Sequence, residues 1–238
     1  MRTRHLLRSW HKWLGLLIGL QMLIWSVSGS YMVAVDIDFI HGDSLVHTEP
    51  RAIDHTTSIL PIASLINEYG ELQGAKLTAW PGSEQPVYEL TTADGSILVD
   101  GVTGERLSPL SSDRIQQLAR SYYAGRGEIA RVEPIERVPV EIRGRAPGLW
   151  RVDFDDWLQT SFYLDATTGA LVTRRHRLWR IFDTFWMLHI MDYGYERDDV
   201  NNTLLRISSA FGLVFGATGL WLLFYSFGRS KRARRSSP

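Results

Sequence analysis

The sequence predicts a membrane protein of the α+β class, and two observations carry the prediction. Residues 14–35 and 207–227 are apolar runs of 22 and 21 residues without a formal charge. Each can cross a hydrocarbon layer of about 30 Å at about 1.5 Å per residue. Between the runs, one helical pattern and three strand-like patterns occur twice. We therefore expect two transmembrane helices that flank a domain of two tandem repeats, each a helix with a three-stranded antiparallel sheet.

The charge distribution predicts the orientation of both spans. All 26 acidic residues lie within 36–203, whereas the flanking segments carry only Lys and Arg. Because such residues next to membrane helices stay in the cytoplasm, we expect cytoplasmic termini and an extracytoplasmic segment 36–203. That segment holds 16 Lys and Arg residues, a formal charge of −10, which argues against nucleic acid as a partner. The alternative for the first run, a cleaved signal peptide, disagrees with its length.

The predicted segments follow from these patterns. They are a basic cytoplasmic N-terminus 1–13, a transmembrane helix 14–35, an irregular connector 36–56, a first repeat 57–110, a second repeat 111–175, an amphipathic helix 176–193 at the membrane interface or against the domain, a transmembrane helix 204–227 and a basic cytoplasmic tail 228–238. In each repeat the helix precedes the strands, and Ser111, Ser112 or Asp113 can cap the second helix. The chain has no cysteine, which excludes disulfides, cysteine-ligated iron–sulfur clusters and covalent c-type haem.

A turn signature closes each repeat. Asp100–Glu105 reads DGVTGE, and 65 residues later Asp165–Ala170 reads DATTGA. The aspartate can accept hydrogen bonds from its own turn, and Gly104 or Gly169 can take a positive φ. We therefore interpret these aspartates as turn-forming residues.

These features resemble a known family. The repeat of a helix, three strands and a closing Asp-Gly turn is similar to the PepSY domain. The motif of Trp10, His11, Trp13 and Gly15, with FWMLHIMDYG before the second span, resembles the PepSY-associated transmembrane helix family. The resemblance covers nearly the whole chain. It implies a bacterial inner-membrane protein that acts as a non-catalytic accessory of an envelope redox or iron and siderophore-uptake system.

The resemblance also implies partners and a cofactor. Larger relatives have four spans and some of them carry b-type haem on membrane histidines, so haem b is the candidate cofactor. The partners expected are the lipid bilayer and an envelope reductase, transporter or peptidase. The alternative function is a membrane-anchored binder or regulator of an exported peptidase or other envelope protein, through pairing at a sheet edge. No common hydrolase or nucleotide-binding motif occurs, and Asp153 and Asp155 fit a solvated strand face, so an enzyme is not favoured.

Three histidines are the candidate haem ligands. His11 and His189 would lie roughly 30 Å apart at opposite faces of the membrane, so one haem cannot bind both. Two arrangements remain: His11 with its counterpart in a homodimer, or His189 with His41. The alternative interpretation is that His11 is an interfacial side chain and that His189 is packed or hydrogen-bonded without a ligand. The other histidines show no metal-ligand spacing.

Small residues at helical spacing predict how the spans pack. Ser26 and Ser30 lie at the same predicted depth as Gly212 and Gly216, so we expect these two stripes to pack together within the chain. Gly15 and Gly19 remain for a dimer contact or for plain packing.

Overall fold

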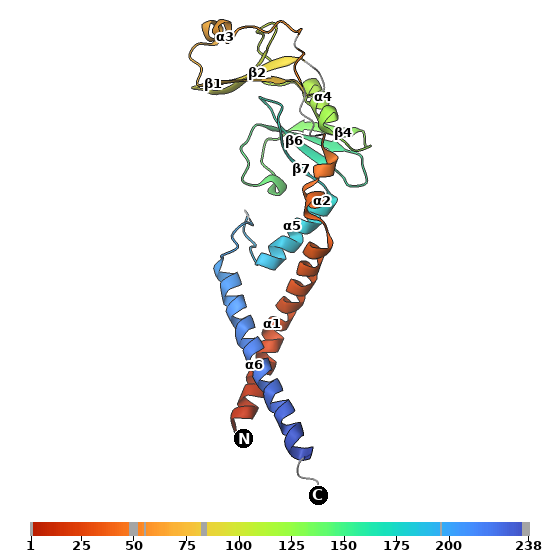
Figure 1. Ribbon diagram of the computed structural model, residues 1–238, viewed down its shortest axis with the longest axis vertical. Coiled ribbons are helices and arrows are strands. Elements are labelled where there is room, and N and C mark those ends of the chain that lie inside the picture. The colour runs from red at the N-terminus through yellow and green to blue at the C-terminus, as the bar shows by residue number, and fades with distance from the viewer. Residues whose placement is uncertain (1, 48–51, 55, 82–84, 196, 235–238) are drawn as a thin grey trace. The chain divides into compact units, whose positions relative to one another are not determined.

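The computed structural model describes residues 2–47, 52–54, 56–81, 85–195 and 197–234, with the side chains of 2–5, 7 and 225–234 excepted. The chain divides into two compact units, which we describe separately (Figure 1). The helical unit comprises Met1–Val35 and Phe182–Pro238, and the sheet unit comprises Asp36–Ile181. The predicted basic tail and the first arginines fall largely outside the described side chains.

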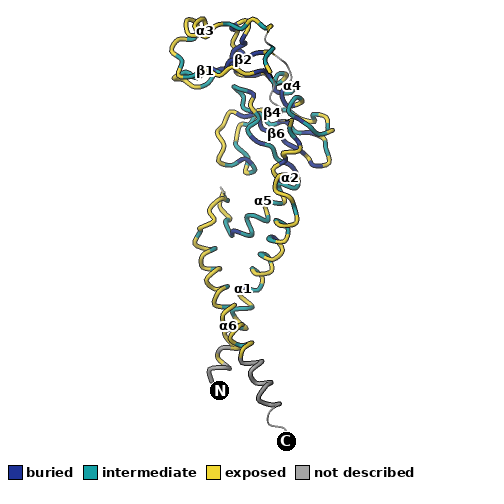
Figure 2. The backbone as a smooth tube through the Cα atoms, in the orientation of Figure 1, coloured by how far each residue is buried: buried dark blue, intermediate teal, exposed yellow. Residues whose placement is uncertain are grey.

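The helical unit contains α1 (Arg2–Ala34), most of α5 (Arg177–Ile190) and α6 (Thr203–Arg234). Segments Arg8–Ala34 and Thr203–Phe224 are long and apolar enough to cross a membrane, in agreement with the two predicted spans. Most of α1 and α6 is exposed along its length (Figure 2), as expected for helices whose apolar side chains face lipid. The predicted helix 176–193 forms as α5.

The sheet unit begins with two short helices where we expected an irregular connector. These are α2 (Ile37–His41) and η1 (Asp43–Leu45). Asp36 caps α2 by accepting from the backbone of Asp38 and Phe39, and Gly42 ends it at φ 73°. The connector prediction was wrong here because a helix of one turn is too short to show a hydrophobic period.

The first repeat has the predicted elements. They are α3 (Ile62–Tyr69), β1 (Gly74–Ala79), β2 (Pro86–Thr92) and β3 (Gly95–Asp100). The strands form an antiparallel sheet of order β1-β2-β3. Gly70 ends α3 with a positive φ of 81°, which a glycine adopts without a Cβ clash.

The second repeat differs from the prediction by one strand. It contains α4 (Ser112–Tyr122), β4 (Ile129–Pro134), η2 (Val140–Ile142), β5 (Leu149–Phe154), β6 (Ser161–Asp165) and β7 (Leu171–Arg175). These strands form a four-stranded antiparallel sheet in sequence order. The expected three-stranded sheet was wrong because the turn at 165–170 reverses the chain and returns it as β7. In the first repeat the segment after the equivalent turn at 100–105 forms only an isolated β-bridge, between Val99 and Arg106.

The two closing turns have the same hydrogen bonds. Asp100 Oδ1 accepts from the backbone N–H of Val102 and Thr103 at 2.7 and 2.9 Å. Asp165 Oδ1 accepts from the two equivalent positions at 2.9 and 2.7 Å. Gly104 and Gly169 both have positive φ, at 79° and 70°. The structural interpretation of the repeated aspartate is confirmed.

Alternation along the strands builds the core of the sheet unit. Val87 and Leu98 face α4, whose Ile115 and Leu118 also contact the aromatic face of the second sheet. The opposite face of the first sheet packs against Leu65 of α3. Helix α4 therefore contributes to one core shared by both repeats, which appears as the buried stretches of the sheets in Figure 2.

Candidate functional site

His11 of α1 makes a specific contact with α6. Its Nδ1 lies 2.9 Å from Thr218 Oγ1. The Thr218 hydroxyl also lies 2.8 Å from the Phe215 carbonyl, and when it donates its proton to this carbonyl it accepts from the imidazole. In this arrangement the proton of a neutral His11 is on Nδ1, and Nε2 keeps its lone pair.

Three further residues shape the space around His11. The Phe215 ring stacks on the imidazole, with centroids 4.3 Å apart and planes at 4°. A Cβ on Gly219 would lie 3.0 Å from His11 Cε1, and a Cβ on Gly15 would lie 3.0 Å from Phe215 Cε2. Both glycines therefore make room for the two stacked rings, and this cluster joins α1 to α6.

The predicted packing of Ser26 and Ser30 against Gly212 and Gly216 is not what the structure shows. Both serines are exposed. In the described structure a Cβ on Gly216 would meet no other segment within 4 Å, and one on Gly212 would meet only Trp25 at 4.0 Å. Spacing along each helix could not show that α5 packs on α1 at this level.

His189 of α5 repeats the arrangement of His11. Its Nδ1 lies 2.9 Å from Ser28 Oγ on α1. Ser28 Oγ also lies 2.7 Å from the Ile24 carbonyl, and when it donates its proton there it accepts from the ring. Gly29 lies beside the ring, with its Cβ position 3.6 Å from His189 Cε1. In this arrangement Nδ1 carries the proton of the neutral imidazole and the Nε2 lone pair remains.

Side chains of α1 and of Asn202, just before α6, form hydrogen bonds with the end of α5. The last carbonyls of a helix have no partner within it. Here the Leu188 carbonyl accepts from Gln21 at 3.4 Å, the His189 carbonyl accepts from Trp25 Nε1 at 2.7 Å, and the Ile190 carbonyl accepts from Asn202 at 2.8 Å. Asn202 Oδ1 also caps α6 by accepting from the backbone N–H of Leu205, the third residue of that helix, at 2.9 Å. The His189 backbone is therefore fixed on two sides.

An ion pair joins the buried Asp183 of α5 to the half-buried Arg197 after this helix. Arg197 Nη1 donates to Asp183 at 2.9 Å, and the Arg197 carbonyl accepts from Trp186 Nε1 at 3.2 Å. Asp183 is buried. Arg197 Nε is buried without a hydrogen-bond partner in the described structure. The pair anchors the segment after α5 to the helix that carries His189.

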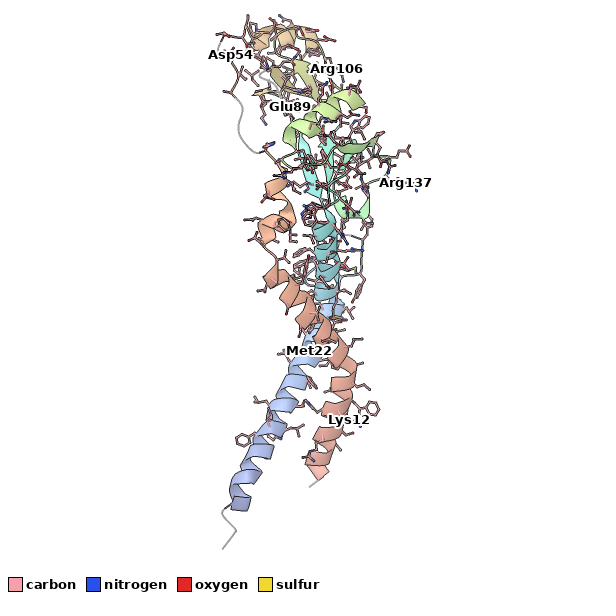
Figure 3. All side chains as sticks on the ribbon, turned by 90° about the vertical axis from the view of Figure 1, so that its right-hand side faces the viewer. Lys12, Met22, Asp54, Glu89, Arg106 and Arg137 are labelled. Carbon is pink, nitrogen blue, oxygen red and sulfur yellow. The ribbon has the colours of Figure 1, made fainter. Side chains whose placement is uncertain are left out.

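The two histidines lie at different depths. His11 falls within the candidate span Arg8–Ala34 and faces Thr218, which lies inside the span Thr203–Phe224. Ser28, the partner of His189, is seventeen residues further along α1, which is about 25 Å of helix. Lys12 and Met22, labelled in Figure 3, mark the intervening part of α1. One haem therefore cannot bind both rings, as expected.

The third candidate, His41, lies at the end of α2 in the sheet unit. Ligand atoms of Asp38, His41 and Asp43 lie within 4.8 Å of one another, and all three residues are exposed. Asp43 is also ion-paired with Arg174. Sequence spacing does not reveal this cluster, because the three residues come together only through the unpredicted turn at Gly42. The pairing of His41 with His189, which belong to different units, stays a prediction.

Two other titratable groups of the sheet unit have structural roles. His176 is buried, and its Nε2 lies 3.0 Å from the Phe39 carbonyl while Nδ1 accepts from Trp179 N at 3.4 Å. Burial lowers the pKa of His176, so the neutral ring is favoured. Asp153 accepts from Arg151 Nε at 2.8 Å and from Ser161 at 2.6 Å. Asp153 is thus part of a packed polar network and not a free strand-face acid.

Glu141 joins this network from η2. It accepts from Arg180 Nε at 2.6 Å and from the Tyr163 hydroxyl. Burial raises the pKa of Glu141, but the hydrogen bonds from Arg180 and Tyr163 outweigh burial and leave the pKa below its ordinary value. Burial and the neighbouring carboxylate raise the pKa of Tyr163. The network fixes the loop between β4 and β5 against the second sheet.

The two spans, the two sheets and the histidine sites define a membrane α+β protein with a folded domain between its membrane helices. Residues 8–238 match the family described as the PepSY-associated TM region, and the chain belongs to this family. No curated protein and no solved structure matches the chain.

Proposed function

We propose that this chain is a haem-binding accessory protein of an envelope redox or iron and siderophore-uptake system in the bacterial inner membrane. The observation that carries the proposal is the shared hydrogen-bond arrangement of His11 and His189. A fixed Nδ1–H and a free Nε2 lone pair are what an axial histidine ligand needs. Membrane histidines that only pack need no such control of the tautomer.

The residues around each ring favour ligation. Thr218 and Ser28 hold the Nδ1 proton and set the ring plane, and Phe215 excludes water from one face of His11. Each site supplies one ligand, so the second must come from another group: the His11 counterpart in a homodimer, His41 for His189, or a side chain of a partner. When bound, haem b would supply one-electron chemistry.

The proposed topology places both termini in the cytoplasm and 36–203 outside. Its support is the restriction of all 26 acidic residues to this segment, because the basic flanks of membrane helices stay in the cytoplasm. The acidic domain would then meet an envelope reductase or transporter, with the chain itself non-catalytic.

The test is the visible absorption spectrum of the full chain in mild detergent, before and after dithionite. Haem is supplied during expression. We expect a Soret band that shifts on reduction and is weakened in His11→Ala, in His189→Ala or in both. Thr218→Val keeps the His11 ligand but removes the Nδ1 acceptor, so it should shift the band or lower haem retention. The control His47→Ala changes an exposed histidine of the sheet unit. A colourless wild type refutes the proposal.

One observation favours a second candidate, a binder of an exported peptidase or other envelope protein. Strand β1 is an edge of its sheet, and 75–78 are all exposed, with Leu77 39% accessible. An exposed edge can accept another strand. A photocrosslinking residue at Leu77 should then capture a defined envelope protein, and one at the exposed turn residue Val102 should not. This function requires no cofactor, so the absorption spectrum separates the two candidates.

A further inference from the structure

An apolar pocket lies between α1 and α6, beyond the His11 contact. Its volume is about 330 Å³. Its walls are formed by 17–25 of α1, Met191 after α5, and 207–211 of α6. No histidine lines it among the described residues, although Gln21 and Trp25, which line it, also donate to carbonyls at the end of α5. This segment of α1 runs on from Lys12 and contains Met22 (Figure 3).

Two polar side chains line this otherwise apolar pocket, Gln21 and Ser208. The Ser208 hydroxyl has no hydrogen-bond partner among the described residues, unlike Ser26 and Ser28, which donate to carbonyls of their own helix. Gln21 donates one bond of 3.4 Å to the Leu188 carbonyl, which leaves its second N–H and its oxygen available. A pocket inside a membrane span thus offers hydrogen-bond donors to a ligand.

Along the helices the pocket lies between two other groups of residues. The stacked His11 and Phe215 lie toward the termini, and Met191, held at a positive φ of 54°, lies at the other end. A transmembrane helix about 10 Å wide cannot run through such a space. Leu17 and Leu20 are 69% and 68% exposed, so a molecule dissolved in the bilayer can enter laterally.

Depth and shape select the occupant. Gln21 is the middle residue of the span Arg8–Ala34, where a phospholipid presents acyl chains and no carbonyl. Trp25 and Phe211 supply aromatic surfaces beside the polar pair. A dry apolar cavity of about 150 Å³ holds benzene, so this pocket has room for a larger substituted ring.

We propose that this pocket binds the head group of an isoprenoid quinone, with the ring beside Trp25 and Phe211 and carbonyl oxygens accepting from Gln21 and Ser208. The pocket has the composition of small-molecule sites, apolar walls with a few convergent polar groups. The isoprenoid tail would leave between the exposed leucines into the lipid. The inference goes beyond the proposed function and does not depend on haem.

The test measures quinone retained by the full chain. Wild type and variants are purified in mild detergent, incubated with decylubiquinone and passed through a size-exclusion column, after which quinone and phospholipid are extracted and quantified. Ser208→Phe fills the pocket. Leu213→Phe is the matched control, because Leu213 is 76% exposed and does not line the pocket. Comparison with this control distinguishes quinone bound in the pocket from quinone dissolved in the detergent micelle.

Wild type and Leu213→Phe should retain equal quinone, and Ser208→Phe should retain only the micelle background. Gln21→Leu should lower the affinity about fivefold, the effect of one lost hydrogen bond. Equal retention in wild type and Ser208→Phe overturns the proposal, as does loss of phospholipid instead of quinone. If Ser208→Phe aggregates, Gln21→Leu decides, since it removes the amide without filling space, and an unchanged affinity then refutes the site.

Discussion

Gly219 and Gly216 lie one helical turn apart on α6, and the structure predicts different effects of enlarging them. A Cβ on Gly219 would lie 3.0 Å from His11 Cε1, whereas one on Gly216 would meet no other segment within 4 Å of the described structure. A leucine at 219 must displace the imidazole from between Phe215 and Thr218. A leucine at 216 projects into lipid.

The magnitude follows from what the Gly219→Leu variant loses. Overpacking of a close contact costs about 1–3 kcal/mol, and the lost hydrogen bond between His11 and Thr218 costs about 0.6 kcal/mol in a membrane. The higher helix propensity of leucine offsets less than about 1 kcal/mol. We therefore expect Gly219→Leu to destabilise the helical unit by about 1–3 kcal/mol, and Gly216→Leu to be neutral.

The assay is thermal unfolding of the full chain in mild detergent, followed by the fraction that remains monodisperse on size exclusion. Gly219→Leu should lower the midpoint and the folded yield, and Gly216→Leu should match wild type. The opposite order would show that α1 and α6 meet along Gly212 and Gly216, as the sequence had predicted, and would refute the packing around His11.

Three further predictions concern the sheet unit and the topology. Asp100→Ala leaves two backbone N–H groups without their acceptor, so denaturant unfolding should show a loss of about 1–3 kcal/mol, against no loss for the exposed control Asp94→Ala. Burial lowers the pKa of His176 below the unfolded value of about 6.5, so the unfolded state binds more protons as pH falls through that value and the stability of the folded state should decrease there. The variant His176→Phe should flatten this pH dependence. An identical pH profile for both proteins would contradict the prediction. The chain has no cysteine, so the single substitutions Ser9→Cys and Ala93→Cys, both at exposed positions, can report the topology. A membrane-impermeant maleimide added to intact spheroplasts should label only Ala93→Cys. Labelling of Ser9→Cys alone would show the opposite orientation.

The parts of the fold that could be predicted from the sequence are those set by local chemistry. The apolar runs predicted both spans, and the turn at Asp100 and Asp165 could be interpreted because its hydrogen bonds join residues two or three apart. The fourth strand of the second sheet was missed although that turn had been identified. A five-residue strand with mostly intermediate burial, Leu171–Arg175, has too little alternation to stand out.

The packing of the helical unit depends on which faces meet, which spacing alone does not give. Ser26 and Ser28 differ by two positions on α1, about 200° around the helix. The structure uses Ser28 against His189 and leaves Ser26 exposed. His11 and His189 were identified as candidate ligands from the resemblance, but their hydroxyl partners could not be, because each belongs to a different helix.

The two histidine sites and the pocket follow one another along α1, so a substitution at one of them can be tested apart from the others. His11 comes first, the pocket around Gln21 follows, and Ser28 with its bound His189 comes last. Trp25 joins the last two, since it lines the pocket and donates to the His189 carbonyl. A ligand that moves this indole would therefore act directly on the backbone that positions His189, whereas His11 lies beyond the stacked aromatic ring of α6. Any coupling between quinone and haem should accordingly concern His189 and leave the His11 site unchanged.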